Sequence, residues 1–413
     1  MQTRPRGGGG AGPRRALLAL CVTEVTSWGV LYYAFPVLIA DLTRDTGWST
    51  ASAIGAFSTG ALVSAVTAVP VGRLIDSRGP RVVMTSGSVL AVLSVLALAA
   101  APTLALFYLA WAVAGVAQAA TLYPPAFAAL TGWYPGTGRI RALTTLTLVA
   151  GLSSTVFAPF TAALLSALSW RQTYLVLAVV LLVVTVPLHA LCLTPPWPGG
   201  SGRSRTTAAR EQDREHSGAV LRSRPFLVLV TVMTLSGFGS YAATINLVPL
   251  LTQRGYSTEF GAWALGLVGV GQVMGRFGYA PLARRSPVAV RTAVIPAAAA
   301  LCVAGIGVLP GPAAALIMLT VLAGAARGAH TLLQASAVAD RWGTRAFGRV
   351  NGVFSAPITA AIALAPAGGA IVAQWLGGYP SGFLVLAALT AAASVAALAT
   401  SVPRKTMDEN VSK

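Results

Sequence analysis

The chain of 413 residues is 55% hydrophobic and only 10% charged, with a mean hydropathy of +0.72. Because soluble domains carry about 25% charged residues, this composition excludes an ordinary soluble protein and indicates an integral membrane protein. The formal charge of +18 would suit a nucleic-acid-binding protein, but the arginines are scattered between apolar segments instead of gathering on one soluble face. We therefore expect a lipid bilayer, and no nucleic acid, as partner.

Apolar segments long enough to cross about 30 Å of hydrocarbon as helices recur along the whole chain. Twelve are predicted, at residues 16–40, 49–71, 81–101, 103–132, 139–167, 171–193, 224–251, 258–283, 287–309, 311–338, 345–374 and 379–402. The sequence therefore predicts an all-α integral membrane fold with twelve transmembrane helices.

The chain begins with a basic, glycine-rich stretch, residues 1–15, which we expect to be a disordered cytoplasmic arm. Arg14 and Arg15 before an apolar run are also typical of a signal peptide. This run is too long for a signal sequence, contains Glu24 and lacks a convincing small-residue cleavage site. We therefore predict a retained first helix.

The sequence GRLIDSRGPR, residues 72–81, lies between the second and third predicted spans. Gly72 allows two helices to approach closely, and Asp76 places a carboxylate near the membrane surface. Gly79 and the proline after it favour a tight turn. The loop carries three arginines, Arg73, Arg78 and Arg81. Because short arginine-rich loops stay in the cytoplasm, we predict that this loop is cytoplasmic.

The basic residues predict the orientation of the whole chain. With both termini inside, 24 of the 29 basic residues fall on the cytoplasmic side. Those outside are Arg44, Arg171 and Arg254, while Arg276 and Arg327 lie within predicted helices. This positive-inside bias predicts a multi-pass protein of the cytoplasmic membrane with cytoplasmic N- and C-termini.

Residues 194–223 are rich in Pro, Gly, Ser and charge, and are predicted to be a cytoplasmic linker. They separate an N-terminal six-helix bundle, residues 16–193, from a C-terminal one, residues 224–402. A cytoplasmic tail, residues 403–413, follows.

The two halves match one another at an offset of about 208 residues, which indicates an internal duplication. The matching pairs are GWST at 47–50 with GYST at 255–258, AGVAQAAT from Ala114 with AGAARGAH from Ala323, Trp133 with Trp342, and YLVLA from Tyr174 with FLVLA from Phe383. The copy of the arginine-rich loop, residues 275–285, carries Arg284 where the first half has Asp76.

Together these features resemble the major facilitator superfamily, whose loop pattern G-x-L-x-D-x-x-G-x-R is matched by residues 72–81. Ser77 replaces the family's usual basic residue after the acid. The resemblance implies two six-helix bundles around a central cavity that opens alternately to each side. It also implies that Asp76 and its arginines latch the cytoplasmic side against helix ends of the other half, because a helix N-terminus stabilises a carboxylate. The alternative is that these charges only set topology.

The ionisable residues that stand out within the spans are Glu24, Arg276, Arg327 and His330. A charged side chain at a helix centre costs roughly 2.5–3.5 kcal/mol unless water or a partner relieves it, so such residues normally face the interior. By the resemblance, Glu24 and Arg327 line the cavity. His330 follows Arg327 by one helical turn, and is either a cavity residue or a hydrogen-bonded packing histidine.

The stretch WGVLYYAFP, residues 28–36, and the pair at 275 and 276 resemble bacterial monocarboxylate and oxalate/formate-type carriers. In related carboxylate carriers an arginine occupies the helix 8 position of Arg276. Gln272 stands where monocarboxylate carriers have an acidic residue. This difference argues against the same proton relay in this chain. Two arginines near a cavity favour an anionic ligand, because a guanidinium holds a carboxylate through two hydrogen bonds.

Glu24 has three interpretations: a proton carrier, a partner that neutralises Arg276 or Arg327, or a contact for a cationic substrate. Further candidates for lining the cavity are Tyr32, Gln118, Tyr241 and Asn246. Aromatic residues in membrane helices are otherwise packing or interfacial residues.

No metal-ligand cluster or catalytic constellation is visible, and Cys21, Cys192 and Cys302 are read as small apolar residues. We expect no cofactor, no metal and no enzymatic activity. The leading hypothesis is a secondary transporter of a small organic anion, a carboxylate, coupled to protons or to exchange and functional as a monomer. One alternative is a proton/drug antiporter in which Glu24 alternately holds a proton and a cationic compound, and another is a non-transporting membrane sensor or enzyme.

Overall fold

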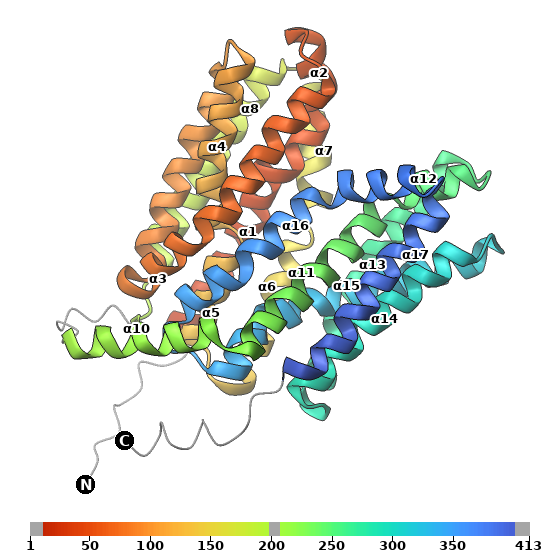
Figure 1. Ribbon diagram of the computed structural model, residues 1–413. Helices are drawn as coiled ribbons and strands as arrows, with labels where there is room; N and C mark the ends of the chain where they lie inside the picture. The colour runs from red at the N-terminus through yellow and green to blue at the C-terminus, as the bar shows by residue number, and fades with distance from the viewer. Residues whose placement is uncertain (1–10, 198–206, 401–413) are drawn as a thin grey trace. The chain divides into compact units, whose positions relative to one another are not determined.

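The computed structural model describes residues 11–197 and 207–400. Within these residues every regular element is a helix (Figure 1), so the predicted all-α fold is confirmed. Most of the predicted arm, residues 1–10, and the predicted tail, residues 403–413, lie outside the described residues.

The chain forms two compact units. Unit 1 comprises Met1–Asp213 and Ala346–Ala356, and unit 2 comprises Arg214–Arg345 and Pro357–Lys413. Residues 346–356 belong to the second half by sequence, yet they pack in unit 1.

The helices of unit 1 follow the six predicted spans of the first half. They are α1 (Ala11–Trp28), the π-helix η1 (Gly29–Tyr33), α2 (Ala34–Thr46), α3 (Thr50–Ala100), α4 (Leu104–Thr121), α5 (Tyr123–Trp133), α6 (Gly136–Ala150), α7 (Ser153–Leu165), α8 (Trp170–Val180), the π-helix η2 (Leu181–Thr185) and α9 (Val186–Cys192). Helix α10 (Thr207–Arg222) lies in the predicted linker.

The second half has fewer interruptions. Its helices are α11 (Arg224–Ile245), α12 (Leu247–Gln253), α13 (Thr258–Arg285), α14 (Val288–Val308), α15 (Ala313–Trp342), α16 (Phe347–Trp375), α17 (Tyr379–Ala397) and the 3-10 helix η3 (Leu398–Thr400).

The described helices are consistent with twelve spans. Ten helical stretches are long and apolar enough to cross a membrane. One of them, Ala51–Ala100, contains two predicted spans, because α3 is broken at Gly79, whose φ of 79° is left-handed. Helix α13, with 28 residues, is long enough for a further span although it carries Arg276 and two terminal arginines.

Helix α1 begins at Ala11, before the predicted start at residue 16. Arg14 and Arg15 therefore lie on its exposed first turns instead of in a disordered arm. A helical start suits this segment because arginine is a good helix former.

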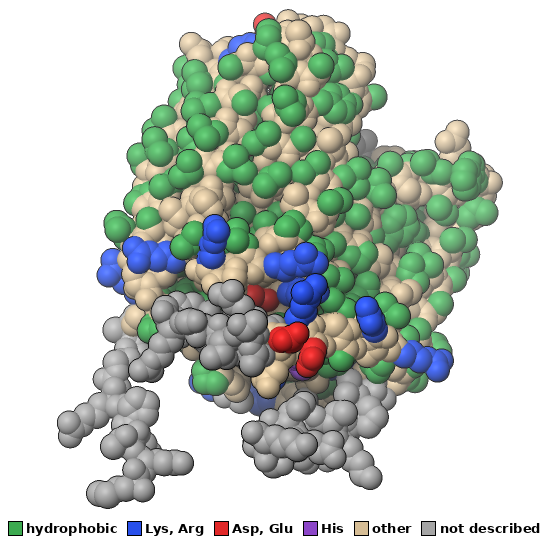
Figure 2. Space-filling model, turned by 60° about the vertical axis from the view of Figure 1, so that its left-hand side comes forward, with side chains coloured by type: hydrophobic (Ala, Val, Ile, Leu, Met, Phe, Trp, Pro, Cys, Tyr) green, Lys and Arg blue, Asp and Glu red, His purple; other side chains and the backbone are tan. Residues whose placement is uncertain are grey.

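Each unit has a hydrophobic core of its own. The large buried residues are Phe35, Phe107, Trp111, Trp170 and Tyr174 in unit 1, and Leu250, Leu251, Phe383 and Leu386 in unit 2. Many large hydrophobic side chains are also exposed, and Figure 2 shows hydrophobic side chains spread over the face drawn. A surface of this kind is suited to lipid.

Candidate functional site

Glu24 lies within the first span, on α1, and is 0% exposed. Neither carboxylate oxygen has a hydrogen-bond partner among the described residues. The indole of Trp28, one turn later, lies near enough to interact with this carboxyl but outside hydrogen-bond geometry. Because a buried carboxylate without a partner is costly, this carboxyl needs a proton or a ligand cation as its partner.

Just beyond Glu24 the helix changes to the π-helix η1, and other helices bond its backbone. The hydroxyl of Ser153, on α7, donates to the carbonyl of Val25 at 2.6 Å. The amide of Gln118, on α4, is buried and donates to the carbonyl of Leu31 at 3.0 Å. Single π-helical turns are common at functional sites. The structure thus places Gln118 as a support for η1.

Aromatic rings surround the start of η1 in unit 1. Trp28 lies 5.4 Å from Tyr32 and 5.2 Å from Tyr123, between ring centroids. Tyr32 also contacts Tyr33 and Phe57, at 5.3 and 5.2 Å. These rings are partly exposed, so this face of unit 1 offers planar apolar surface one turn from Glu24.

In unit 2 the structure brings Arg327, Tyr241 and His330 together. The guanidinium of Arg327 lies 3.8 Å from the ring centroid of Tyr241, a cation–π contact between α15 and α11. The Nε of Arg327 has no hydrogen-bond partner, and no carboxylate pairs with this guanidinium among the described residues. Arg327 is half-buried and carries a charge that no described protein group neutralises.

His330, one turn after Arg327, is 6% exposed and its Nε2 lies 2.9 Å from the hydroxyl of Ser236. Because this hydroxyl already donates to the carbonyl of Val232 at 2.7 Å, the ring N–H donates to Ser236. His330 therefore joins α15 to α11 one helical turn along α15 from the contact between Arg327 and Tyr241.

Helices α13 and α15 cross with their backbones in contact. The crossing uses Gly271 and Gly275 on α13 and Gly324 and Gly328 on α15, where an added Cβ would overlap a carbonyl of the facing helix. This is the spacing that lets membrane helices pack closely. It brings the helix of Arg276, a residue only 5% exposed, against the helix of Arg327.

Asn246 separates α11 from α12 and is 5% exposed. Its amide donates to the carbonyls of Ala242 at 2.9 Å and Pro366 at 3.3 Å. The side chain thus satisfies backbone groups at a helix break.

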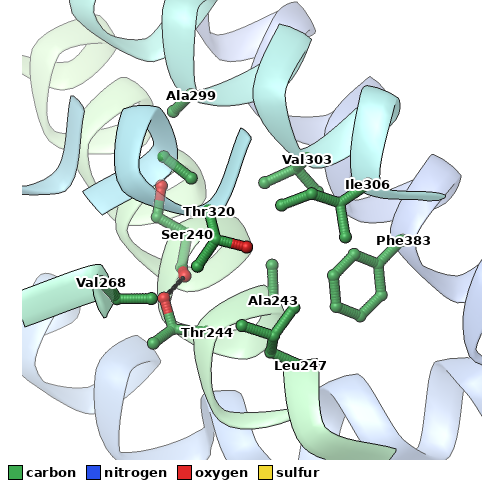
Figure 3. Close-up of a pocket in the computed structure, with 11 residues that line it drawn as sticks. Ser240, Ala243, Thr244, Leu247, Val268, Ala299, Val303, Ile306, Thr320 and Phe383 are labelled. Carbon is green, nitrogen blue, oxygen red and sulfur yellow. Dashed lines mark hydrogen bonds between the residues drawn. The ribbon is translucent and has the colours of Figure 1, made fainter. Parts of the chain in front are cut away.

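A cavity of about 20 Å³ lies inside unit 2 (Figure 3). One of its lining residues, Ser240, directly precedes Tyr241. The hydroxyl-bearing residues that line it are Ser240, Thr244 and Thr320, and the remainder is apolar. Thr244 donates to the carbonyl of Ser240 at 2.8 Å, the dashed line in Figure 3. The volume suits about one water molecule, so this cavity is too small for an organic substrate.

The arginine-rich loop lies against the first turn of α16, within unit 1. The carboxylate of Asp76 accepts hydrogen bonds from the backbone N–H groups of Gly348 and Arg349, each at 2.7 Å. At Gly72 an added Cβ would overlap the carbonyl of Gly348, so only glycine permits this approach.

The neighbours of Asp76 in the loop are placed differently. Arg81 donates to the carbonyl of Ala190 at 2.7 Å, near the end of α9. Arg78 is exposed. The ring of Trp197 packs over Gly79, at the break in α3.

Sequence reasoning missed two groups of residues. His189, a fully buried histidine within the sixth span, was not distinguished from its apolar surroundings. The paired G-x-x-x-G spacings in GQVMG and GAARG were visible, and would have predicted the α13–α15 crossing. Among the described residues no group of three or more metal-binding side chains occurs.

Membrane-length helices in two units, with ionisable side chains inside the spans, define a polytopic membrane protein. The model of the Major Facilitator Superfamily matches residues 20–321, about three quarters of the chain, so the chain belongs to that family. It is therefore a membrane transporter and not an enzyme.

Two curated proteins match part of the chain. The chain is 31% identical over 242 residues to an uncharacterized 38 kDa protein in the 23S RNA operon of Thermoproteus tenax, covering 58% of this chain and 63% of that protein. It is 26% identical over 263 residues to monocarboxylate transporter 13 of Bos taurus, covering 62% and 57%. The chain thus spans about three fifths of the length of these curated relatives.

Solved structures share the fold. The transporter FucP in its outward conformation superposes with a TM-score of 0.73 at 15% identity, covering 94% of this chain and 99% of that one. The human organic anion transporter MFSD10 (TETRAN) gives a TM-score of 0.69 at 18% identity, covering 93% and 99%.

Proposed function

We propose that this protein is a secondary transporter of a small organic anion, a carboxylate, working by alternating access. The observation that carries the proposal is the half-buried Arg327 guanidinium, held over the Tyr241 ring with no described carboxylate to neutralise it. A substrate carboxylate would supply the missing charge through paired hydrogen bonds. The similarity to monocarboxylate transporter 13 over about three fifths of that protein's length supports the same substrate class.

The ring of Tyr241 has a specific role in this proposal. A guanidinium that lies over an aromatic face is held in position by the ring, and the N–H groups along its edge remain available to a ligand. The N–H groups at that edge are then oriented for a planar carboxylate. His330, one turn away, would add a second polar contact for substrates that carry another oxygen.

Glu24 is proposed as the site of the coupled proton. Its carboxyl is buried and has no cationic partner among the described residues, which favours the proton-carrier interpretation over neutralisation of an arginine. A proton neutralises the carboxyl, and its release must accompany exposure to water or to a cation. Coupling is symport if the proton crosses in the same direction as the substrate, and exchange if it crosses in the opposite direction.

The cellular setting proposed is the cytoplasmic membrane, with both termini inside and a monomer as the functional form. The arginine distribution supports this orientation. The separate core in each unit supports a monomer, because each unit buries its large apolar residues within one chain.

The test is counterflow of radiolabelled monocarboxylates into proteoliposomes with purified protein. Arg327→Ala should reduce exchange at least about a hundredfold and Arg327→Lys nearly as much, because lysine lacks the planar pair of donors. Tyr241→Phe should retain exchange, and Tyr241→Leu should raise KM about tenfold through loss of the cation–π contact. The matched control is Arg285→Ala, which removes an exposed arginine of the same unit. Carboxylate exchange that survives Arg327→Ala would contradict the site.

A second candidate function is proton/drug antiport at Glu24. The partly exposed rings of Trp28, Tyr32 and Tyr123 favour it, because aromatic faces beside a carboxylate bind organic cations. The same liposomes, given a pH gradient and a lipophilic cation, separate the two functions. Cation flux that is abolished by Glu24→Gln, together with no carboxylate exchange, would establish the antiporter and overturn the anion proposal.

A further inference from the structure

His189, on α9, joins three helices of unit 1 through one buried ring. Its Nδ1 lies 2.7 Å from the hydroxyl of Ser88 on α3, and its Nε2 lies 2.9 Å from the hydroxyl of Thr23 on α1. All three side chains are 0% exposed. Intramembrane ionisable residues usually serve a function, and the proposed transport cycle has so far given this histidine none.

One tautomer of the ring satisfies both contacts. With the proton on Nε2, the ring donates to Thr23, whose hydroxyl donates in turn to the carbonyl of Leu20 at 3.2 Å. The unprotonated Nδ1 then accepts from the hydroxyl of Ser88. In this tautomer the ring is neutral and both of its nitrogens are bonded, so it is a complete tie between helices.

This tie ends on the residue next to Glu24. Three buried polar side chains from three different helices bond α1 and η1 around that carboxyl: His189 at Thr23, Ser153 just after Glu24, and Gln118 within η1. No described residue bonds the carboxyl itself. The surrounding helices thus fix the backbone that carries Glu24 while its side chain stays without a partner.

Cys21 on α1 and Tyr123 on α5, whose ring lies 5.2 Å from that of Trp28, are titratable groups near this part of α1. Helix α6, which carries Arg139 and Arg141, packs against α1. Neither oxygen of Glu24 has a hydrogen-bond partner among the described residues. Helices η2 and α9 also pack on α1, and the His189 ring is a polar link between α9 and the Glu24 helix.

We propose that His189 is a positioning residue for the Glu24 proton site: by tying Thr23 to α3 and α9, it keeps the Glu24 carboxyl buried and without a partner. The inference rests on the proposed function, in which Glu24 binds the coupled proton. When the tie is removed, α1 is free to shift and water reaches the carboxyl.

The probe is dicyclohexylcarbodiimide, which reacts with protonated carboxyls in apolar surroundings. The carboxyl proton moves to a carbodiimide nitrogen and the carboxyl oxygen bonds to the central carbon, giving an O-acylurea that rearranges to a stable N-acylurea. Purified full-length protein in liposomes is treated at about pH 7, where an ordinary exposed carboxyl is ionised. Mass spectrometry of the Glu24 peptide gives the labelling rate without any substrate.

We expect His189→Leu to lower the labelling rate of Glu24 about tenfold, because a carboxyl that water reaches is mostly ionised at about pH 7 and the ionised form does not react. His189→Gln should restore most of it, because an amide accepts from Ser88 and donates to Thr23. Thr23→Val cuts the tie from the other side and should reproduce the loss if His189→Leu fails to fold. The matched control is Thr185→Val, which removes a buried hydroxyl of the same span that bonds only within its own helix.

The outcomes separate this inference from the proposed function. Labelling that is unchanged in both His189→Leu and Thr23→Val overturns the role of His189 alone, as does a loss in His189→Gln as large as that in His189→Leu. A wild-type protein whose Glu24 is never labelled overturns the proton site and the role of His189 together. Labelling that behaves as expected in a protein without carboxylate exchange refutes only the substrate class.

Discussion

At the scale of single residues, Asp76 is the group whose contacts most constrain the cycle. Its carboxylate accepts two backbone hydrogen bonds at the first turn of α16, where the helix dipole adds to them. Hydrogen bonds to a charged group contribute about 1.5–3 kcal/mol each, so this contact stabilises the conformation in which it forms. We propose that it is a latch which breaks and reforms during transport.

Asp76→Asn should change the turnover of transport about three- to tenfold, because asparagine keeps the shape of the side chain but loses the charge that the helix N-terminus stabilises. Initial rates of counterflow are compared at equal amounts of protein. The control is Ser77→Ala, at an exposed neighbour whose hydroxyl bonds only to the carbonyl of Leu74 in its own helix. Equal rates for wild-type and Asp76→Asn proteins would leave the loop with a topological role only.

Polar residues within the spans show what sequence reasoning can and cannot supply at this scale. Their presence predicts that something inside the protein satisfies them, and Arg327 and His330 are indeed brought together with Tyr241. Gln118 and Asn246 look equally suited to bind a ligand, but the structure engages both with backbone carbonyls. Which polar group is left for a ligand depends on helix breaks and π-helical turns that no residue pattern in this chain marks.

At the scale of elements, equivalent hydrogen bonds occur within each of the two halves, at positions related by the duplication. The indole of Trp170 donates to Asp45 at 2.8 Å in unit 1, and the backbone N–H of Tyr379 donates to Gln253 at 2.9 Å in unit 2. The residues of these pairs are separated by about 208 positions, the offset of the duplication. Each bond fastens the start of the sixth helix of a half to the end of its first.

Equivalent helices in the two halves are capped by arginines that come from non-equivalent elements: Arg171 lies on α8, and Arg254 follows α12. Arg171 donates to the carbonyl of Ala101 at 3.0 Å, at the end of α3, and Arg254 donates to that of Leu309 at 2.6 Å, after α14. Cations at a helix C-terminus satisfy carbonyls that have no partner within the helix. The duplication predicts that these ends are equivalent, but not that arginines from different elements reach them.

The crossing of α13 and α15 makes a prediction that distinguishes packing from mere helix flexibility. Gly275→Ala should lower Tm by about 5 °C, because the added methyl meets the backbone of Ala325, which cannot move aside without separating the helices. Gly278→Ala is the control on the same helix: nothing lies within 4 Å of its added Cβ, so Tm should stay equal or rise slightly. Thermal unfolding in detergent measures both. An equal decrease in the two variants would mean that the crossing is not the cause.

At the scale of the whole molecule, the sequence supplied the fold class because hydrocarbon imposes a simple length rule on helices. The twelve apolar segments and their duplication needed no tertiary information. The boundaries between the two units did need tertiary information, because residues 346–356 pack in unit 1 although the duplication assigns them to the second half. The cause is local, since glycines at 348 and 352 fit closely against α3.

Orientation is the remaining prediction at this scale, and it decides which side the Asp76 contact closes. Ser77 and Ser166 are both exposed and lie on opposite predicted sides of the membrane, while all three native cysteines are buried and should react little. With cytoplasmic termini, a membrane-impermeant maleimide should label Ser166→Cys in intact cells and Ser77→Cys only in inverted vesicles. The opposite pattern would place the arginine-rich loop outside, against the positive-inside bias of 24 basic residues, and would make Asp76 an external contact. Labelling as expected makes the contact between Asp76 and α16 a closure on the cytoplasmic side, because both partners lie at the end of the helices that carries Ser77.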